Sequence, residues 1–227
     1  EMFIRDSLIT EKSLPKPISL YSKLCLKYEK YLNILWSVIA LGMAYSVFQE
    51  ILFAHEWDLL VWLFIHIMVA VLFLIRSSPI YYSSSITGYL IAIASVNYYL
   101  LFDFNTINDS LSYSFGKVVM LIGGIMCFVS TLSLGRNFGI LPINRGVKTK
   151  AAYRFVRHPI YLSYIVLDSG IIMAFPSKKN CAVLFAGILL YILRIRYEEK
   201  VMERSEEYQE YKKKMKYKLI PFVYCVY

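Results

Sequence analysis

A short motif in the C-terminal half of the chain could bind an anion. Arg157 and His158 stand directly before Pro159, and an apolar run begins at Ile160. Proline is favoured at the first position of a helix, where backbone N–H groups lack partners and the helix dipole is positive. A cation and an imidazole placed there are typical of a site for a carboxylate or a phosphate. The same charges also suit a cytoplasmic loop of a membrane protein, and the motif alone leaves both interpretations open.

Tyr153 and Tyr161 flank this motif and could hold a flat ligand against their rings. The chain contains 20 tyrosines, however, and aromatic residues commonly gather at membrane interfaces. Neither tyrosine is therefore specific for a ligand by itself.

Two adjacent carboxylates, Glu198 and Glu199, stand where the last apolar run ends. A carboxylate in that place can accept two hydrogen bonds from a ribose diol. The alternative is a solvated charge run in which both pair with basic neighbours, namely Arg194, Arg196 and Lys200. Arg194 could likewise neutralise an anionic acceptor or simply snorkel to the membrane surface.

The elements that carry these groups are predicted to form an antiparallel helical hairpin over residues 160–196. Residues 176–179, Pro-Ser-Lys-Lys, make a tight connection between two apolar runs. The arms on either side are nearly equal in length, so His158 and Glu198 should meet at the same end. Arg194 should lie on the Glu198 face of its helix, one turn closer to the membrane.

The composition indicates an integral membrane protein. Of the 227 residues, 58% are hydrophobic, and the mean hydropathy is positive. A net charge of +9 would suggest nucleic acid as a partner of a soluble protein. Here the lipid bilayer explains the charge better, and we expect no nucleic acid. The four cysteines have neither zinc-site nor disulfide-framework spacing, and we expect no metal.

Apolar runs predict an all-α, polytopic membrane helical bundle with about six spans. The runs cover residues 32–53, 59–75, 86–102, 115–134, 160–175 and 181–195. Amphipathic helices are expected on the membrane surface over 15–31 and 197–218. We expect a single membrane domain over residues 1–227, divided into an N-terminal segment (1–31), four spans (32–134), a loop (135–159), the hairpin (160–196) and a C-terminal helix and tail (197–227).

Lysine and arginine are distributed unevenly among the loops. They crowd residues 1–31, 136–157 and 194–218, whereas residues 55–58 and 103–109 contain none. The positive-inside rule therefore predicts a multi-pass protein with both termini and the 135–159 loop in the cytoplasm. The sequence indicates neither which membrane holds the protein nor its oligomeric state.

Three polar residues interrupt the predicted spans. Asp168 is ionisable, and such a group is costly in a membrane unless it is paired or hydrated. It is a functional candidate without an assigned partner. For His66 and Asn97 we expect hydrogen bonds between helices.

Three ordered motifs make the C-terminal part of the chain resemble the isoprenylcysteine carboxyl methyltransferase and phospholipid methyltransferase family. They lie at residues 135–161, 194–199 and 207–221. The resemblance implies a multi-span membrane enzyme that uses S-adenosylmethionine. It also implies a cofactor site at Arg145, Gly146, Val147, Lys148, Tyr153, His158, Pro159, Tyr161 and Glu198, with Arg194 facing the acceptor. The chain departs from the family at Ala151-Ala152 and Ser163, where members often have glycine.

The resemblance implies methyl transfer to a lipophilic, membrane-borne acceptor at the cytoplasmic face. An arginine near the acceptor favours carboxyl O-methylation of an isoprenylcysteine-like substrate. Phospholipid N-methylation and small-thiol S-methylation are alternatives within the family. An NADPH-dependent enzyme of the sterol-reductase type, or a noncatalytic protein whose basic loop binds anionic lipid, are alternatives outside it.

Overall fold

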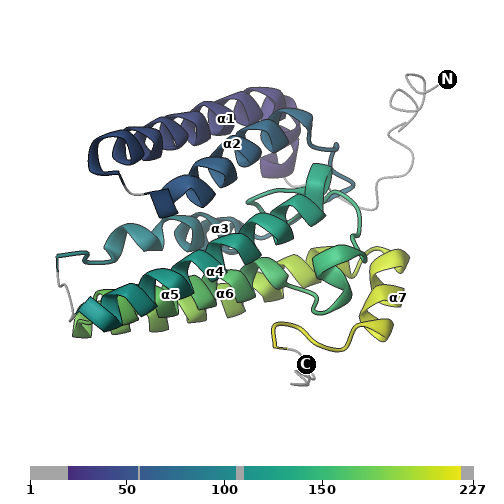
Figure 1. Cartoon of the computed structure of the whole chain (residues 1–227). Helices are drawn as coiled ribbons and strands as arrows, with labels where there is room; N and C mark the ends of the chain where they lie inside the picture. Colours follow the sequence, from purple (N-terminus) through teal and green to yellow (C-terminus); the bar gives the residue numbers. More distant parts are fainter. Residues whose placement is uncertain (1–19, 56, 106–109, 221–227) are drawn as a thin grey trace.

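The computed structural model describes residues 20–55, 57–105 and 110–220 (Figure 1). Within these residues the α-helices are α1 (Leu20–Ala54), α2 (Leu60–Ile75), α3 (Ile86–Asn97), α4 (Ser110–Leu134), α5 (Pro159–Ala174), α6 (Lys178–Met202) and α7 (Glu206–Lys214). Short 3₁₀ helices are η2 (Trp57–Leu59), η3 (Tyr98–Leu101), η4 (Gly135–Asn137) and η5 (Ala151–Arg154). Strand β1 (Tyr81–Tyr82) pairs antiparallel with β2 (Ile143–Asn144).

The apolar helices follow the runs that predicted them. In the described part of the chain, Tyr28–Phe53, Leu111–Asn137 and Lys178–Met202 are long and apolar enough to cross a membrane. Leu60–Ile75, Ile86–Leu101 and Pro159–Ala174 are shorter apolar helices. The helical class and the membrane character are confirmed, whereas the number of six spans stays a prediction.

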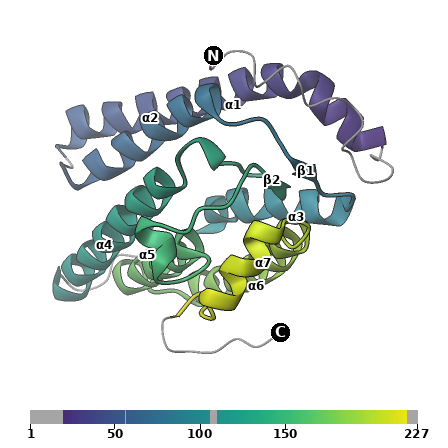
Figure 2. The ribbon, with the colours of Figure 1, turned by 90° about the vertical axis from the view of Figure 1, so that its right-hand side faces the viewer.

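The helices form two groups in space. Helices α1 and α2 run side by side, and α3 to α6 lie together across from them (Figures 1 and 2). Helices α4 and α5 approach closely because glycines face the contact. A Cβ atom on Gly116 would lie 2.5 Å from the backbone N of Ala174, and one on Gly123 would lie 2.7 Å from that of Leu167.

The structure corrects the bounds of both helices that were predicted on the membrane surface. Residues 20–31 continue into the first apolar run as the single helix α1, because no glycine or proline interrupts the chain between Leu20 and Gly42. Residues 1–19 and 221–227 lie outside the described residues. At the C-terminal end, α6 continues to Met202, and the separate helix α7 covers only Glu206–Lys214.

Among the described residues, the hydrogen bonds of the His66 and Asn97 side chains stay within their own helices, which corrects the prediction of bonds between helices. Nδ1 of His66 hydrogen-bonds with the carbonyl oxygen of Trp62 at 2.7 Å, and Nδ2 of Asn97 donates to that of Ile93 at 2.8 Å. In each case the carbonyl lies one turn earlier on the same helix face and satisfies the side chain locally.

Candidate active site

The N-terminus of α5 and the last turns of α6 meet at one end of the molecule. A short connection, residues 175–177, reverses the chain between the helices. Pro159 lies in the first turn of α5, as the motif predicts. Nε2 of His158 lies 3.0 Å from Oε1 of Glu199. The Tyr161 hydroxyl donates to Oε1 of Glu198 at 2.5 Å. Residues separated by a whole hairpin are thus brought into contact.

Glu199 is the buried counter-charge of this end of the molecule, with 5% of its surface exposed. Besides His158, its carboxylate lies 3.3 Å from Nη1 of Arg157 and 3.2 Å from Nζ of Lys218. It also accepts a hydrogen bond of 3.2 Å from the Tyr208 hydroxyl. The carboxylate therefore links α6 to the segment before α5, to α7 and to the C-terminal segment.

The C-terminal segment also binds the Arg157–His158 backbone. The N–H of Arg157 donates to the carbonyl of Tyr217, and the N–H of His158 to that of Lys218, each at 2.9 Å. These two amide groups are satisfied within the protein. Any anion bound here would have to contact side chains or the first turn of α5.

Arg194 lies one turn before Glu198 and points inward. Its Nε donates to Oε1 of Glu198 at 3.0 Å, its Nη1 to Oγ of Ser95 at 2.9 Å, and its Nη2 to the carbonyl of Ile140 at 2.6 Å. The guanidinium also lies 5.4 Å from the centroid of the Tyr161 ring, within the range of a cation–π contact. Since the residue is 6% exposed, the snorkelling alternative is wrong.

The loop after β2 begins with Arg145, whose side chain is buried and hydrogen-bonded. Nη2 of Arg145 donates to Oε1 of Glu29 on α1 at 2.6 Å, and Nη1 donates to the carbonyl of Ser77. Gly146 has a φ of +112°, and a Cβ there would lie 2.9 Å from Nδ2 of Asn137, so this position needs glycine. The Arg145 side chain therefore holds the loop, and the N–H of Gly146 donates to Oδ1 of Asn144 at 2.7 Å.

Tyr153 is buried beneath α7. Tyr208 and Tyr211 form a cluster with it, Val147 packs against this cluster, and the Tyr211 hydroxyl donates to the carbonyl of Tyr153 at 2.6 Å. Burial, assisted by the charge of Glu199, raises the pKa of Tyr208, and burial raises the pKa of Tyr211. Both hydroxyls remain proton donors at neutral pH. Lys148, next to Val147, is half-buried.

The two departures from the family pattern are accommodated differently. Ala151 adopts a left-handed backbone with a φ of +53°, a conformation that favours glycine. Ser163 is fully buried, and its hydroxyl donates to the carbonyl of Ile160 at 2.6 Å. The serine hydroxyl is thereby satisfied on its own helix.

Sequence reasoning singled out Glu198 for the site and missed the central place of Glu199. Successive helix residues point about 100° apart, which sends one carboxylate toward Tyr161 and the other toward His158. This periodicity could have separated their roles. Tyr208 and Lys218 lie in the 207–221 motif, but the motif did not predict their contacts with Glu199, because these depend on how the chain returns after α6.

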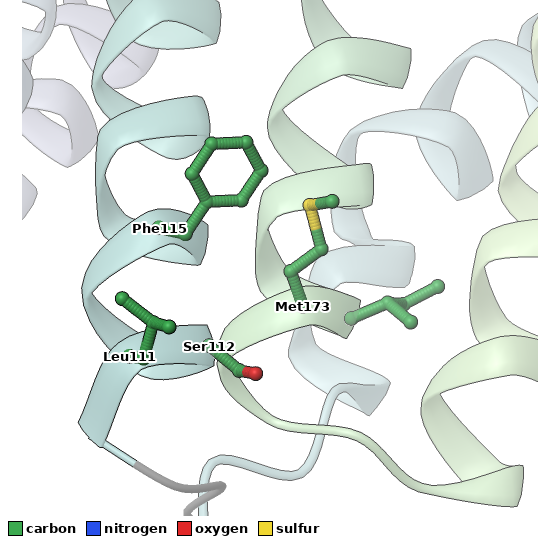
Figure 3. Close-up of a pocket in the computed structure, with 5 residues that line it drawn as sticks. Leu111, Ser112, Phe115 and Met173 are labelled. Atoms are coloured by element: carbon green, nitrogen blue, oxygen red, sulfur yellow. The ribbon is translucent and has the colours of Figure 1, made fainter.

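The opposite end of α4 and α5 carries a surface depression of apolar character (Figure 3). It is lined by Leu111, Ser112, Phe115, Ile172 and Met173. It lies near the C-terminus of α5, whereas the polar cluster lies at its N-terminus, so the two are separate. Within residues 20–55, 57–105 and 110–220, no group of three or more His, Cys, Asp or Glu side chains is arranged to hold a metal ion.

The comparison with known protein families matches part of the chain. Residues 117–204, from α4 through α6, match the model of the isoprenylcysteine carboxyl methyltransferase (ICMT) family. No curated protein matches the chain. The matched region contains the α5–α6 end described above and excludes α1, α2, α3 and α7.

Proposed function

We propose that the protein is a membrane methyltransferase, because residues 117–204 match the model of the isoprenylcysteine carboxyl methyltransferase family. The protein transfers the methyl group of S-adenosylmethionine to a lipophilic acceptor at the cytoplasmic membrane face. The reaction is carboxyl O-methylation of an isoprenylcysteine-like substrate. The observation that carries this proposal is the convergence of Glu198, Tyr161 and Arg194 beside the His158–Glu199 pair.

The residues present fit S-adenosylmethionine. The Glu198 side chain is 23% exposed, and its contacts with Tyr161 and Arg194 both engage Oε1. Its Oε2 therefore suits a ribose hydroxyl. Both carboxylate oxygens of Glu199 already contact cationic groups of the protein, namely Arg157 and Lys218. The charge of Glu199 therefore balances these cations. The backbone of Arg145–Lys148, together with Tyr153, His158 and Pro159, would complete the binding site.

When bound, this cofactor supplies a methyl group already activated by a sulfonium. The protein then has mainly to align the acceptor with that group and to exclude water. A carboxylate acceptor is ionised at neutral pH and needs no general base. Arg194 suits such an acceptor because a guanidinium offers a planar set of donors that matches a carboxylate. Ser95 and the Ile140 carbonyl hold that plane in one orientation.

A methyl-transfer assay with radiolabelled S-adenosylmethionine tests the proposal. The purified full chain in lipid vesicles receives a prenylcysteine, an aminophospholipid or a small thiol. We expect label on the prenylcysteine, released by alkali as methanol because the product is an ester. Label on the phospholipid or thiol alone would replace the proposed acceptor. Absence of transfer to every acceptor would overturn the proposed reaction.

A further inference from the structure

Asp168 is a buried carboxylate in the middle of α5 that the site described above does not use. It is 2% exposed and lies among apolar helices, where an unpaired charge would be very costly. Its Oδ2 accepts a hydrogen bond from the Tyr98 hydroxyl on η3 and another, at 3.4 Å, from the Tyr191 hydroxyl on α6. The Tyr191 hydroxyl also bonds to the Tyr98 oxygen, so its single proton is shared between Asp168 and Tyr98. The carboxylate thus joins η3, α5 and α6.

Gly187 on α6 leaves room for the Tyr98 ring to pack against this helix. A Cβ atom on Gly187, one turn before Tyr191 on α6, would lie 2.5 Å from Cε2 of Tyr98. Only glycine lets the Tyr98 ring approach α6 so closely. The rings of Tyr98 and Tyr191 then meet edge to face, with centroids 5.6 Å apart. Both the ring and the hydroxyl of Tyr191 are therefore fixed by neighbours.

From Tyr191 the contacts continue to the candidate active site. The Tyr191 ring lies 5.7 Å from the ring of Tyr161, centroid to centroid. Tyr161 in turn donates its hydroxyl to Glu198 and supports the Arg194 guanidinium with its ring face. A displacement of Tyr191 would therefore be passed to Tyr161 by direct packing, because closely packed side chains leave little room to absorb it.

We propose that Asp168 is a positioning residue for the active site. By holding the hydroxyls of Tyr98 and Tyr191, it fixes the Tyr191 ring, which holds Tyr161 where its hydroxyl orients the Glu198 carboxylate. This inference rests on the proposed function, since it assigns Glu198 to the cofactor. The alternative is that Asp168 only clamps η3, α5 and α6 together and has no influence on the site.

The test measures binding of S-adenosylhomocysteine by calorimetry and thermal unfolding of the ligand-free protein in the same detergent. Asp168→Asn keeps the shape but weakens the two hydrogen bonds, and Tyr98→Phe removes one donor. We expect about tenfold weaker binding for each variant, because a displaced Tyr191 would let Tyr161 shift and orient the Glu198 carboxylate less well. Tyr99→Phe is the matched control, because this neighbouring tyrosine is 40% exposed, and its binding should equal that of the parent.

A double-mutant cycle separates positioning from clamping. If Asp168 acts through the Tyr161 hydroxyl, Asp168→Asn should weaken binding about tenfold in the parent and much less in a Tyr161→Phe background. Equal losses in both backgrounds, or lower thermal stability with unchanged binding, would overturn the inference. If the parent itself binds no S-adenosylhomocysteine, the proposed function fails first and the inference fails with it. If the parent binds and Tyr161→Phe weakens binding but Asp168→Asn does not, the inference alone fails.

Discussion

At the scale of single residues, two adjacent carboxylates have different roles. Glu199 is buried among Arg157, His158 and Lys218, whereas Glu198 is partly exposed and contacts Tyr161 and Arg194. Glu199 neutralises cations that the fold brings together, and Glu198 is suited to a ligand. Because a buried charge needs its partner, Glu199 should matter for stability more than any exposed acid of the same helix.

We predict that Glu199→Gln lowers thermal stability strongly. Removal of one partner of a buried ion pair costs about 3–5 kcal/mol, since the remaining cations stay buried without compensation. The control is Glu203→Gln, because Glu203 pairs with Lys212 while 43% of its side chain is exposed. That pair should contribute less than about 1 kcal/mol. Thermal melts in detergent check this, and equal melting temperatures for the two variants would contradict the assigned role.

Arg194→Lys should lower the kcat/KM of methyl transfer by about tenfold or more. A lysine ammonium cannot reach Glu198, Ser95 and the Ile140 carbonyl together or present a planar fork to a carboxylate. Arg196→Lys is the control, because Arg196 is exposed on the same helix. Steady-state rates with the preferred acceptor provide the measurement. Comparable activity of the two variants would argue that the guanidinium has no part in the acceptor site.

At the scale of elements, the apolar runs predicted α2 to α6 closely because burial in lipid and in the core imposes long apolar segments. The equal hairpin arms predicted His158 and Glu198 at the same end, and in the structure His158 contacts the adjacent Glu199. The β1–β2 pairing and the fold of the 135–159 loop could not be predicted, since short strands carry little periodicity. Nor could the Tyr98–Asp168 bond, whose partners lie on separate elements and meet only after the helices pack.

The close contact of α4 and α5 depends on residues that lack a side chain. Gly123→Ala should destabilise the protein by about 1–3 kcal/mol, because its Cβ would lie 2.7 Å from the backbone of Leu167. Gly42→Ala on α1 is the control. Apart from the adjacent residues and the backbone of its own helix, no heavy atom of the described residues would lie within 4 Å of a Cβ atom at position 42, and alanine favours a helix by about 1 kcal/mol. A Gly123→Ala protein that melts at or above the temperature of Gly42→Ala would show that these helices are not tightly packed.

At the scale of the whole molecule, the proposed orientation makes the active site cytoplasmic. Lys150 lies exposed in the loop before η5, and Lys179 lies exposed at the α5–α6 connection, at the far end of the hairpin. In a background without the native cysteines, Lys150→Cys and Lys179→Cys should react with a membrane-impermeant maleimide from opposite sides. Labelling in sealed, oriented vesicles measures this. Reaction of both cysteines from one side would contradict the orientation derived from the basic loops.

We propose that S-adenosylmethionine binds at the end shared by α5 and α6. The most direct test is calorimetric titration of the purified full chain in detergent with S-adenosylhomocysteine and, separately, with NADPH. We predict saturable binding of S-adenosylhomocysteine that weakens in Glu198→Gln and His158→Ala but not in Glu203→Gln, and no heat from NADPH. Heat from NADPH with none from S-adenosylhomocysteine, or binding unaffected by Glu198→Gln and His158→Ala, would contradict the claim.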